Sequence, residues 1–323
     1  MPRVAVDALG GDRAPGEVIL GARDAAARGV EVVLYGPAGL RTGGLELVET
    51  TEEITMAEKP AEAVRAKPDS SLVAAVRAVA AGEADAVVSA GNTGAMLAAG
   101  LLHLRRLPGV MRPAIAVPIP AVEGPSVLLD AGANADARPE HLVQFAHMGA
   151  IFSAELLGVR EPRVRLLSIG EEDEKGNQLV LEAHRLLRED DRVNFAGNAE
   201  SRDLLRGAAD VVVADGFTGN IALKLLEGTI RELLGELRDE ISATAAGRLG
   251  GLLIRPASRR LRARLDPDTY GGAYLLGVRG VVVIAHGNSG RAAVANAIEL
   301  AARGAVSGVV DRLADRLPER VGV

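Results

Sequence analysis

Short runs of Val, Ile and Leu alternate along the chain with longer segments whose apolar residues recur at helical spacing. Such alternation is typical of βαβ units, in which helices cover both faces of a mostly parallel sheet. The runs hold few polar residues, as expected for strands buried on both faces. Strands are predicted at 4–6, 30–35, 86–88, 115–119, 127–129, 164–169, 193–195, 211–213 and 281–284. Helices are predicted from about 15, at 71–81, 92–106, 178–188, 221–242 and 291–303, and in a segment that ends at 157.

Two neighbouring strands break the parallel pattern. The link between 119 and 127 is too short for a crossover helix, so these strands are expected to pair antiparallel within a mixed sheet. Helix 92–106 is apolar nearly all round, which predicts burial. No Pro/Ser-rich linker and no internal repeat divides the sequence. We therefore expect one α/β domain over 1–323 with a protruding helical segment at about 221–268; two lobes that share the sheet are the alternative.

Composition narrows the functional classes. The chain has 323 residues, 48% hydrophobic and 25% charged, which is typical of a folded globular protein. It has no Cys, which excludes disulfides, thiolate metal ligands and Cys nucleophiles. The N-terminus has no apolar signal core, and no apolar run approaches the ~18 residues needed to span a bilayer, so we expect a cytoplasmic protein. A net charge of −6 and only seven aromatic residues, three Tyr and four Phe, disfavour nucleic-acid binding.

Seven predicted strands are followed by turns rich in Gly, Asn, Asp and Ser. Ligands of open α/β sheets bind at the carboxyl ends of strands, so these turns are expected to meet at one end of the sheet. Glycine lets the backbone approach a ligand, and the N–H groups at a helix N-terminus bind anions. The turns therefore predict a phosphate or carboxylate ligand, although each one alone is also ordinary turn chemistry. They are 7–12, 89–94, 130–136, 170–176, 196–198, 215–220 and 286–290.

Several standard catalytic motifs are absent from the sequence. It has no P-loop Gly-Lys-Ser/Thr, no spaced triple glycine in its first turn, no His-Glu-x-x-His and no Gly-x-Ser-x-Gly. Four of its five His residues lie in helical patterns and are interpreted as structural or solvent-facing. His286 differs, because it follows an aliphatic strand within a Gly-rich turn, where a catalytic group is expected.

The block DGFTGN at 215–220, together with Lys224 and Glu227, is the most specific of a series of blocks that runs in order along almost the whole chain. With this series the chain resembles the phosphate acyltransferase family of bacterial phospholipid synthesis. Two departures, Ala131 in place of a β-branched residue and Gly290 after the His-Gly-x-Ser turn, remove no reactive group. The other blocks are VAVDALGGDRAP (4–15), SAGNTGA (89–95), RPA (112–114), DAGAN (130–134), QFAHMG (144–149), IGEE (169–172) with KG (175–176), FAGNAE (195–200), YGGA (270–273) and HGNS (286–289).

The resemblance implies a three-layer α/β/α fold with a mostly parallel mixed sheet, similar to phosphotransacetylases and isocitrate-dehydrogenase-like proteins. It implies that inorganic phosphate attacks the thioester of acyl-acyl carrier protein directly and gives acyl phosphate and free carrier protein. No covalent enzyme intermediate, metal or cofactor takes part in such a reaction. It further implies a cytoplasmic, peripherally membrane-associated homodimer. That dimer would transiently contact the membrane surface and the downstream glycerol-phosphate acyltransferase.

Side chains in the Gly-rich turns are expected to serve this chemistry. A thiolate leaving group, with a pKa near ~8.5, needs little acid assistance, so the enzyme has to orient phosphate and stabilise the tetrahedral oxyanion. Lys224 or His286 would supply positive charge or move a proton. The expected phosphate-binding residues are Ser89, Asn92, Thr93 and Thr218, and the expected catalytic residues are Asn198, Asn220, Lys224 and His286.

Two other functions stay open at this point. One is a nicotinamide-dependent decarboxylating dehydrogenase, which would hold Mg²⁺ on carboxylates. Its candidate ligands would be Asp7, Asp12, Asp130 and Asp215. The other is a non-catalytic protein that binds lipid or acyl chains.

A basic and apolar segment follows the long helix. Residues 247–265 contain six Arg and no acid before Asp266. This composition predicts docking of the acidic carrier protein or contact with an anionic bilayer, with a solvated helical hairpin as the alternative. Apolar positions of helix 221–242, from Leu226 to Ile241, predict a dimer interface unless they face the protein's own core. The expected membrane or carrier-protein contacts are Leu252, Leu253, Ile254, Arg255, Arg259, Arg260 and Arg262.

Overall fold

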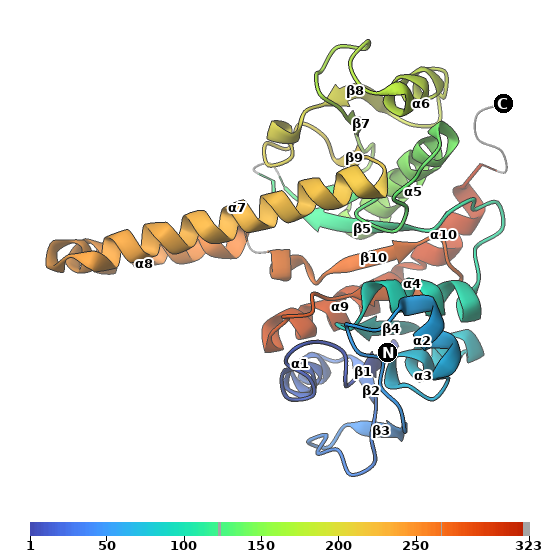
Figure 1. The fold of residues 1–323 in the computed structure, drawn as a ribbon, viewed down its shortest axis with the longest axis vertical. Helices are drawn as coiled ribbons and strands as arrows, with labels where there is room; N and C mark the ends of the chain where they lie inside the picture. The colour runs from blue at the N-terminus through green and yellow to red at the C-terminus, as the bar shows by residue number, and fades with distance from the viewer. Residues whose placement is uncertain (122–123, 266, 319–323) are drawn as a thin grey trace.

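The computed structural model describes residues 1–121, 124–265 and 267–318, which form an α/β/α fold around one eleven-stranded sheet (Figure 1). Across the sheet the strands follow the order β3, β2, β1, β4, β11, β10, β5, β6, β9, β7 and β8. Their bounds are β1 Arg3–Asp7, β2 Glu31–Gly36, β3 Glu46–Glu49, β4 Ala86–Ser89, β5 Ala114–Ile119, β6 Ser126–Leu129, β7 Val164–Leu167, β8 Phe195–Ala199, β9 Val211–Val213, β10 Ala273–Leu276 and β11 Val281–Ile284.

Alternate strand residues enter two cores, one on each face of the sheet. In β1, Val4 and Val6 belong to one core and Ala5 to the other. The first core is covered by α1 (Gly16–Ala27), α5 (Pro139–Leu157), α6 (Gln178–Arg188), α9 (Arg291–Ser307) and α10 (Val309–Arg316). The second is covered by α2 (Pro60–Ala66), α3 (Ser71–Ala81), α4 (Thr93–Ala99) and the start of α7 (Gly216–Ala243).

Two sets of strands run in opposite directions. β10 pairs antiparallel with β11 and with β5, and β5 pairs antiparallel with β6. The expected antiparallel pairing of strands 115–119 and 127–129 is therefore confirmed as β5 and β6. Together with the pairings of β10, it reverses the strand direction between the two halves of the sheet. β1, β2, β4 and β11 run one way, and β6, β7, β8 and β9 run the other. The expectation that all seven polar turns meet at one end was wrong, because these central antiparallel pairings reverse the strand direction.

The turns are thus divided into two groups that leave their strands in opposite directions. Those after β1, β4 and β11 lie at what we call the first end of the sheet, and those after β6, β7, β8 and β9 lie at the second end. The pairing register keeps the two groups close together, because Leu129 at the end of β6 is level with Val283 near the end of β11.

The helix predicted at 92–106 also differs from expectation. α4 ends at Ala99 and continues as a π-helical turn, Gly100–Leu104. Leu101 and Leu102 are exposed, so only one side of this segment is buried. Among the described residues no single helix is long and apolar enough to cross a membrane, while the bent pair α9 and α10 passes that test by length and composition.

α7 and α8 (Ala245–Leu265) form a pair of helices that projects from the body (Figure 1). We call residues 228–265 the arm. The buried residues of α7 are Gly216, Gly219 and Leu223, all in its first turns, and α8 buries none. The segment expected to protrude, 221–268, includes Asp266, which lies outside the described residues.

Candidate active site

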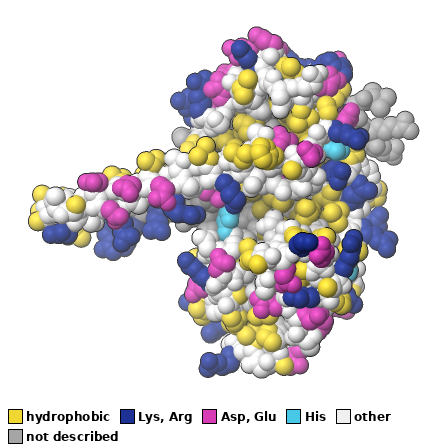
Figure 2. Space-filling model, viewed as in Figure 1, with side chains coloured by type: hydrophobic (Ala, Val, Ile, Leu, Met, Phe, Trp, Pro, Cys, Tyr) yellow, Lys and Arg dark blue, Asp and Glu magenta, His cyan; other side chains and the backbone are white. Residues whose placement is uncertain are grey.

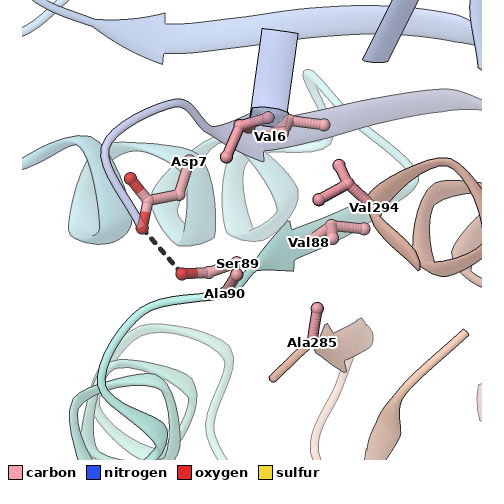
Figure 3. A pocket seen from close by; sticks show the side chains of 8 residues that line it. Val6, Asp7, Val88, Ser89, Ala90, Ala285 and Val294 are labelled. Carbon is pink, nitrogen blue, oxygen red and sulfur yellow. Dashed lines mark hydrogen bonds between the residues drawn. The ribbon is translucent and has the colours of Figure 1, made fainter. Parts of the chain in front are cut away.

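At the first end, the turn after β4 is fixed by a buried carboxylate from β1. Asp7 accepts a hydrogen bond from the Ser89 hydroxyl at 2.6 Å (Figure 3) and another from the Ser71 hydroxyl of α3 at 2.6 Å. The Ser89 oxygen in turn accepts the N–H of Gly91 at 2.9 Å. Ser89, an expected phosphate-binding residue, is therefore buried and bonded within the protein.

Asn92 begins α4 and holds a neighbouring loop. Its Oδ1 accepts the N–H of Ala95 at 3.1 Å, which is an N-cap. Its Nδ2 lies 3.3–3.4 Å from the carbonyl oxygens of Thr55, Met56 and Glu58 in the loop before α2. Thr93 is exposed in the first turn of α4, where N–H groups have no intrahelical partner. The side chain of Asn92 is thus used for structure, and Thr93 is the exposed residue of this turn, since residues 89–92 are buried.

His286 lies beside the same turn and contacts α7. The N–H of Ala285 donates to the carbonyl of Ser89 at 2.9 Å, which joins the two turns. His286 Nε2 lies 3.0 Å from Glu227 Oε1 of α7. Burial alone would raise the pKa of Glu227, but contact with His286 and the charges of His286, Lys224 and Arg231 outweigh it and hold that pKa below its ordinary value. Glu227 is therefore an anion at neutral pH, placed to orient His286.

At the second end, Asp130 organises the turn after β6. Its carboxylate is fully buried and accepts the N–H groups of Ile115, Gly132, Ala133 and Asn134, and the Asn134 side-chain amide. Because both carboxylate oxygens accept bonds from the protein, Asp130 serves to shape the turn after β6.

The first turn of α7 packs directly on this Asp130 turn. A Cβ on Gly219 would lie 2.0 Å from the carbonyl oxygen of Asp130, so only glycine fits there. Asp215 caps the helix by accepting the N–H of Thr218 at 2.9 Å and its hydroxyl at 2.7 Å. Thr218 is exposed, and its hydroxyl proton is used by this cap.

α7 joins the two ends of the sheet. Asn220 lies beside Gly132 of the turn after β6, because a Cβ on Gly132 would lie 3.6 Å from Asn220 Oδ1. Asn220, Lys224 and Glu227 are spaced by four and three residues, so they share one face of the helix. Along that face, Asn220 at the second end and Glu227, which contacts His286 at the first end, are about 10 Å apart. The structure thus brings Asn220, Lys224 and His286 onto one line.

Asn198 is separate from this line. It is buried on β8, at the edge of the sheet, and its amide donates to the carbonyls of Glu172 at 2.8 Å and Lys175 at 3.3 Å. Its Oδ1 lies 3.0 Å from His184 Nδ1. Both amide protons are engaged in holding loop 170–176, which favours a structural role. Its catalytic role stays a prediction.

An open depression near this loop is acidic. It is lined by Glu171, Glu172, Glu200 and Arg202, and the Arg202 guanidinium pairs with Glu200 at 2.9 Å. The excess of negative charge would repel phosphate. Within 1–121, 124–265 and 267–318, no group of three or more His, Asp or Glu side chains is placed to hold a metal ion.

The arm carries the other expected contact residues. Leu252, Leu253 and Ile254 are exposed on α8, with Leu253 at 81%. Arg255, Arg259, Arg260 and Arg262 are also exposed, and within the described part of the chain none pairs with an acid. Figure 2 shows Lys and Arg side chains along one edge of the arm and Asp and Glu along the opposite edge.

Sequence reasoning gave Glu227 no chemical role, considered Asp7 only as a metal ligand of the alternative dehydrogenase, and missed Ser71. Glu227 had a usable signal, because it lies three residues after Lys224 and seven after Asn220, on one helix face. The link from Ser71 to Asp7 had none, since 64 residues separate them.

Comparisons with known proteins agree with this architecture. The model of the family described as fatty acid synthesis protein matches residues 2–312. Phosphate acyltransferase of Heliobacterium modesticaldum is 46% identical, with 99% of this chain and 98% of that protein covered. The enzyme of the same name from Nostoc punctiforme is 44% identical, with 96% and 95% covered. A phosphotransacetylase from Streptococcus pyogenes shares the fold, with a TM-score of 0.62, 18% identity and 94% of each chain covered. The expected family and fold are thereby confirmed, and the chain belongs to the phosphate acyltransferase family of acyltransferases.

Proposed function

We propose that the enzyme transfers the acyl group of acyl-acyl carrier protein to inorganic phosphate, giving acyl phosphate and free carrier protein. The observation that carries the proposal is the line formed by Asn220, Lys224 and the Glu227–His286 pair on α7. It places an amide and two basic groups along one face, suited to an anionic nucleophile and a developing oxyanion.

The proposed reaction is a direct attack. A phosphate oxygen bonds to the thioester carbonyl carbon, the carbon–sulfur bond breaks, and the thiol of the carrier protein leaves. Lys224 offsets the negative charge of phosphate, and His286, held by Glu227, stabilises charge or moves a proton. The main chain of the Ser89–Gly94 turn binds phosphate. Thr218, whose N–H and hydroxyl both donate to Asp215, shapes the first turn of α7, so its predicted contact with phosphate would require that cap to open. No group of the enzyme is acylated, because phosphate is the nucleophile.

The arm is proposed to serve the partners of this reaction. The exposed Arg255, Arg259, Arg260 and Arg262 of α8, which we call the Arg face, suit the acidic carrier protein. The exposed Leu252, Leu253 and Ile254 suit an anionic membrane surface. We infer a cytoplasmic homodimer that meets the membrane transiently and hands acyl phosphate to the downstream glycerol-phosphate acyltransferase.

Carrier-protein release tests the proposal. The enzyme is mixed with acyl-acyl carrier protein and phosphate in the presence of EDTA, and free carrier protein is measured. We expect phosphate-dependent release with equal formation of acyl phosphate. Failure to turn over would contradict the function. Labelled carrier protein that exchanges into acyl-acyl carrier protein without phosphate would instead reveal an acyl-enzyme and contradict direct attack.

A further inference from the structure

We propose that Asp7 is a positioning residue, which sets the Ser89–Asn92 turn for phosphate through the hydroxyls of Ser71 and Ser89. The inference rests on the proposed function, because it takes this turn to bind phosphate.

Both oxygens of the Asp7 carboxylate accept a short hydrogen bond from a serine. Asp7 is 2% exposed, and the Ser71 and Ser89 hydroxyls each lie 2.6 Å from one of its two oxygens. That length is typical of a hydroxyl that donates to an ionised carboxylate. Figure 3 shows Asp7 and Ser89 bonded across the carboxyl ends of β1 and β4, beside a small pocket whose other labelled side chains are Val and Ala.

The Ser89 hydroxyl both accepts and donates a hydrogen bond. The Ser89 oxygen accepts the N–H of Gly91, and the Ser89 hydroxyl donates its single proton to Asp7. Burial holds the pKa of Asp7 above its ordinary value, and the bonds from Ser71, Ser89 and the N–H groups of Leu9 and Gly10 offset only part of that rise. The Ser89 hydroxyl therefore has no proton left for a ligand, and phosphate would be met by the main-chain N–H groups that the turn presents.

Asp7, Ser89 and the turn after β4 are packed tightly around Gly10. A Cβ on Gly10 would lie 2.6 Å from Asp7 Oδ2, 2.7 Å from the Ser89 hydroxyl and 2.8 Å from the Gly91 nitrogen. The carboxylate, the hydroxyl and the turn are thus packed against one another, so a shift of Asp7 moves the turn. The Ser71 hydroxyl of α3 donates to the other carboxylate oxygen, Oδ1, so Ser71 reaches the turn only through Asp7.

Two adjacent serines of α3 provide a matched test. Ser71 and Ser70 are both buried, but Ser70 caps α3 by accepting the N–H of Val73 and donates to the carbonyl of Lys67. We expect Ser71→Ala to raise the KM for phosphate about tenfold, the scale of one lost hydrogen bond to a charged group, with a smaller change in kcat. Ser70→Ala is expected to lower the unfolding temperature and leave that KM within twofold of wild type.

A double-mutant cycle separates positioning from direct contact. If Ser71 and Ser89 act through the same carboxylate, Ser71→Ala with Ser89→Ala raises the phosphate KM by less than the product of the two single effects. Ser71→Thr keeps a hydroxyl and is expected to restore much of the wild-type KM. Each variant is first checked for cooperative unfolding, and the smaller Ser71 changes are used because Asp7→Asn alters a fully buried group.

Two outcomes would overturn the inference. One is a Ser71→Ala enzyme that matches Ser70→Ala in phosphate KM, and the other is strictly multiplicative effects of Ser71→Ala and Ser89→Ala. Either result, with wild-type turnover intact, refutes the role of Asp7 and leaves the proposed function standing. A wild-type enzyme that releases no carrier protein refutes the function itself.

Discussion

At the scale of single residues, polar side chains near the turns are mostly used to build them. Asn92 caps a helix and holds loop 55–58, Asp130 gathers the turn after β6, and Asn198 holds loop 170–176. Sequence position alone selected Asn92 and Asn198 as groups that meet the substrate, and Asp130 as a metal ligand of the alternative dehydrogenase. It could not distinguish a group that meets a ligand from one that shapes the loop, because the bonding partners come from distant segments.

Asn92→Ala is expected to lower kcat/KM for phosphate by about 10²-fold, the scale of losing an oxyanion donor or its placement. The variant loses the cap and the bonds to loop 55–58 together. Asn92→Ser keeps a capping oxygen and loses the longer amide, so it separates the two effects. Steady-state kinetics on folded enzyme provide the measurement, and normal kinetics for Asn92→Ala would refute the assignment of this turn to phosphate.

Glu227→Gln is expected to reduce kcat by about 10–10²-fold, the scale of an impaired general acid or base. The lowered pKa of Glu227 keeps it ionised at neutral pH, so the change removes a full charge beside His286. Glu232→Gln on the exposed surface of the same helix serves as the control. Equal kcat for both variants would contradict the role of the Glu227–His286 pair.

At the scale of elements, local pattern predicted most strands and helices, since buried strands need apolar runs. It missed β3, whose ELVE sequence lies exposed at the sheet edge, and β10, which is short and follows a Gly-Gly turn. Strand direction was not predictable either. β5, β6 and β10 find their partners across the sheet, and it is this pairing that divides the turns between two ends.

Replacing Leu252, Leu253 and Ile254 with Ser is expected to abolish co-sedimentation with anionic vesicles and leave turnover in solution largely unchanged. Burying each such side chain contributes about 1.5–3 kcal/mol, so three together dominate weak interfacial binding. Val306→Ser, an exposed apolar residue of the body, is the control. Undiminished binding of the triple variant to phosphatidylglycerol vesicles would show that these residues do not contact the membrane.

Reversing Arg259, Arg260 and Arg262 to Glu is expected to raise the KM for acyl-acyl carrier protein about tenfold or more at low salt. Attraction between α8 and an acidic partner is screened by salt. The wild-type KM should therefore rise with ionic strength, while the KM of the reversed variant changes little. Replacement by Gln should give an intermediate value. Unaltered carrier-protein kinetics would indicate that the Arg face does not dock the carrier protein.

At the scale of the whole molecule, the arm is too exposed to be explained by the body alone. Only Leu226, at the start of the stripe on α7, packs against the core of the body, and no residue of α7 beyond Leu223 is fully buried, so the rest of the stripe does not face that core. Leu226, Ile230, Leu234 and Ile241 are half-buried, while Leu233 and Leu237 are 65% and 55% exposed. A projecting helical pair with this much apolar surface is typical of an association surface.

We expect a homodimer in solution, in which a second copy covers Leu233 and Leu237. Light scattering at micromolar concentration should give twice the 33.4 kDa mass of the chain. Leu233→Asp with Leu237→Asp would place charges in the buried interface and should yield a monomer that unfolds cooperatively. Val306→Asp, at a position on the body that is 74% exposed, should remain dimeric. A wild-type protein with the mass of one chain would contradict the dimer, and a double variant that stays dimeric would place the interface elsewhere on the molecule.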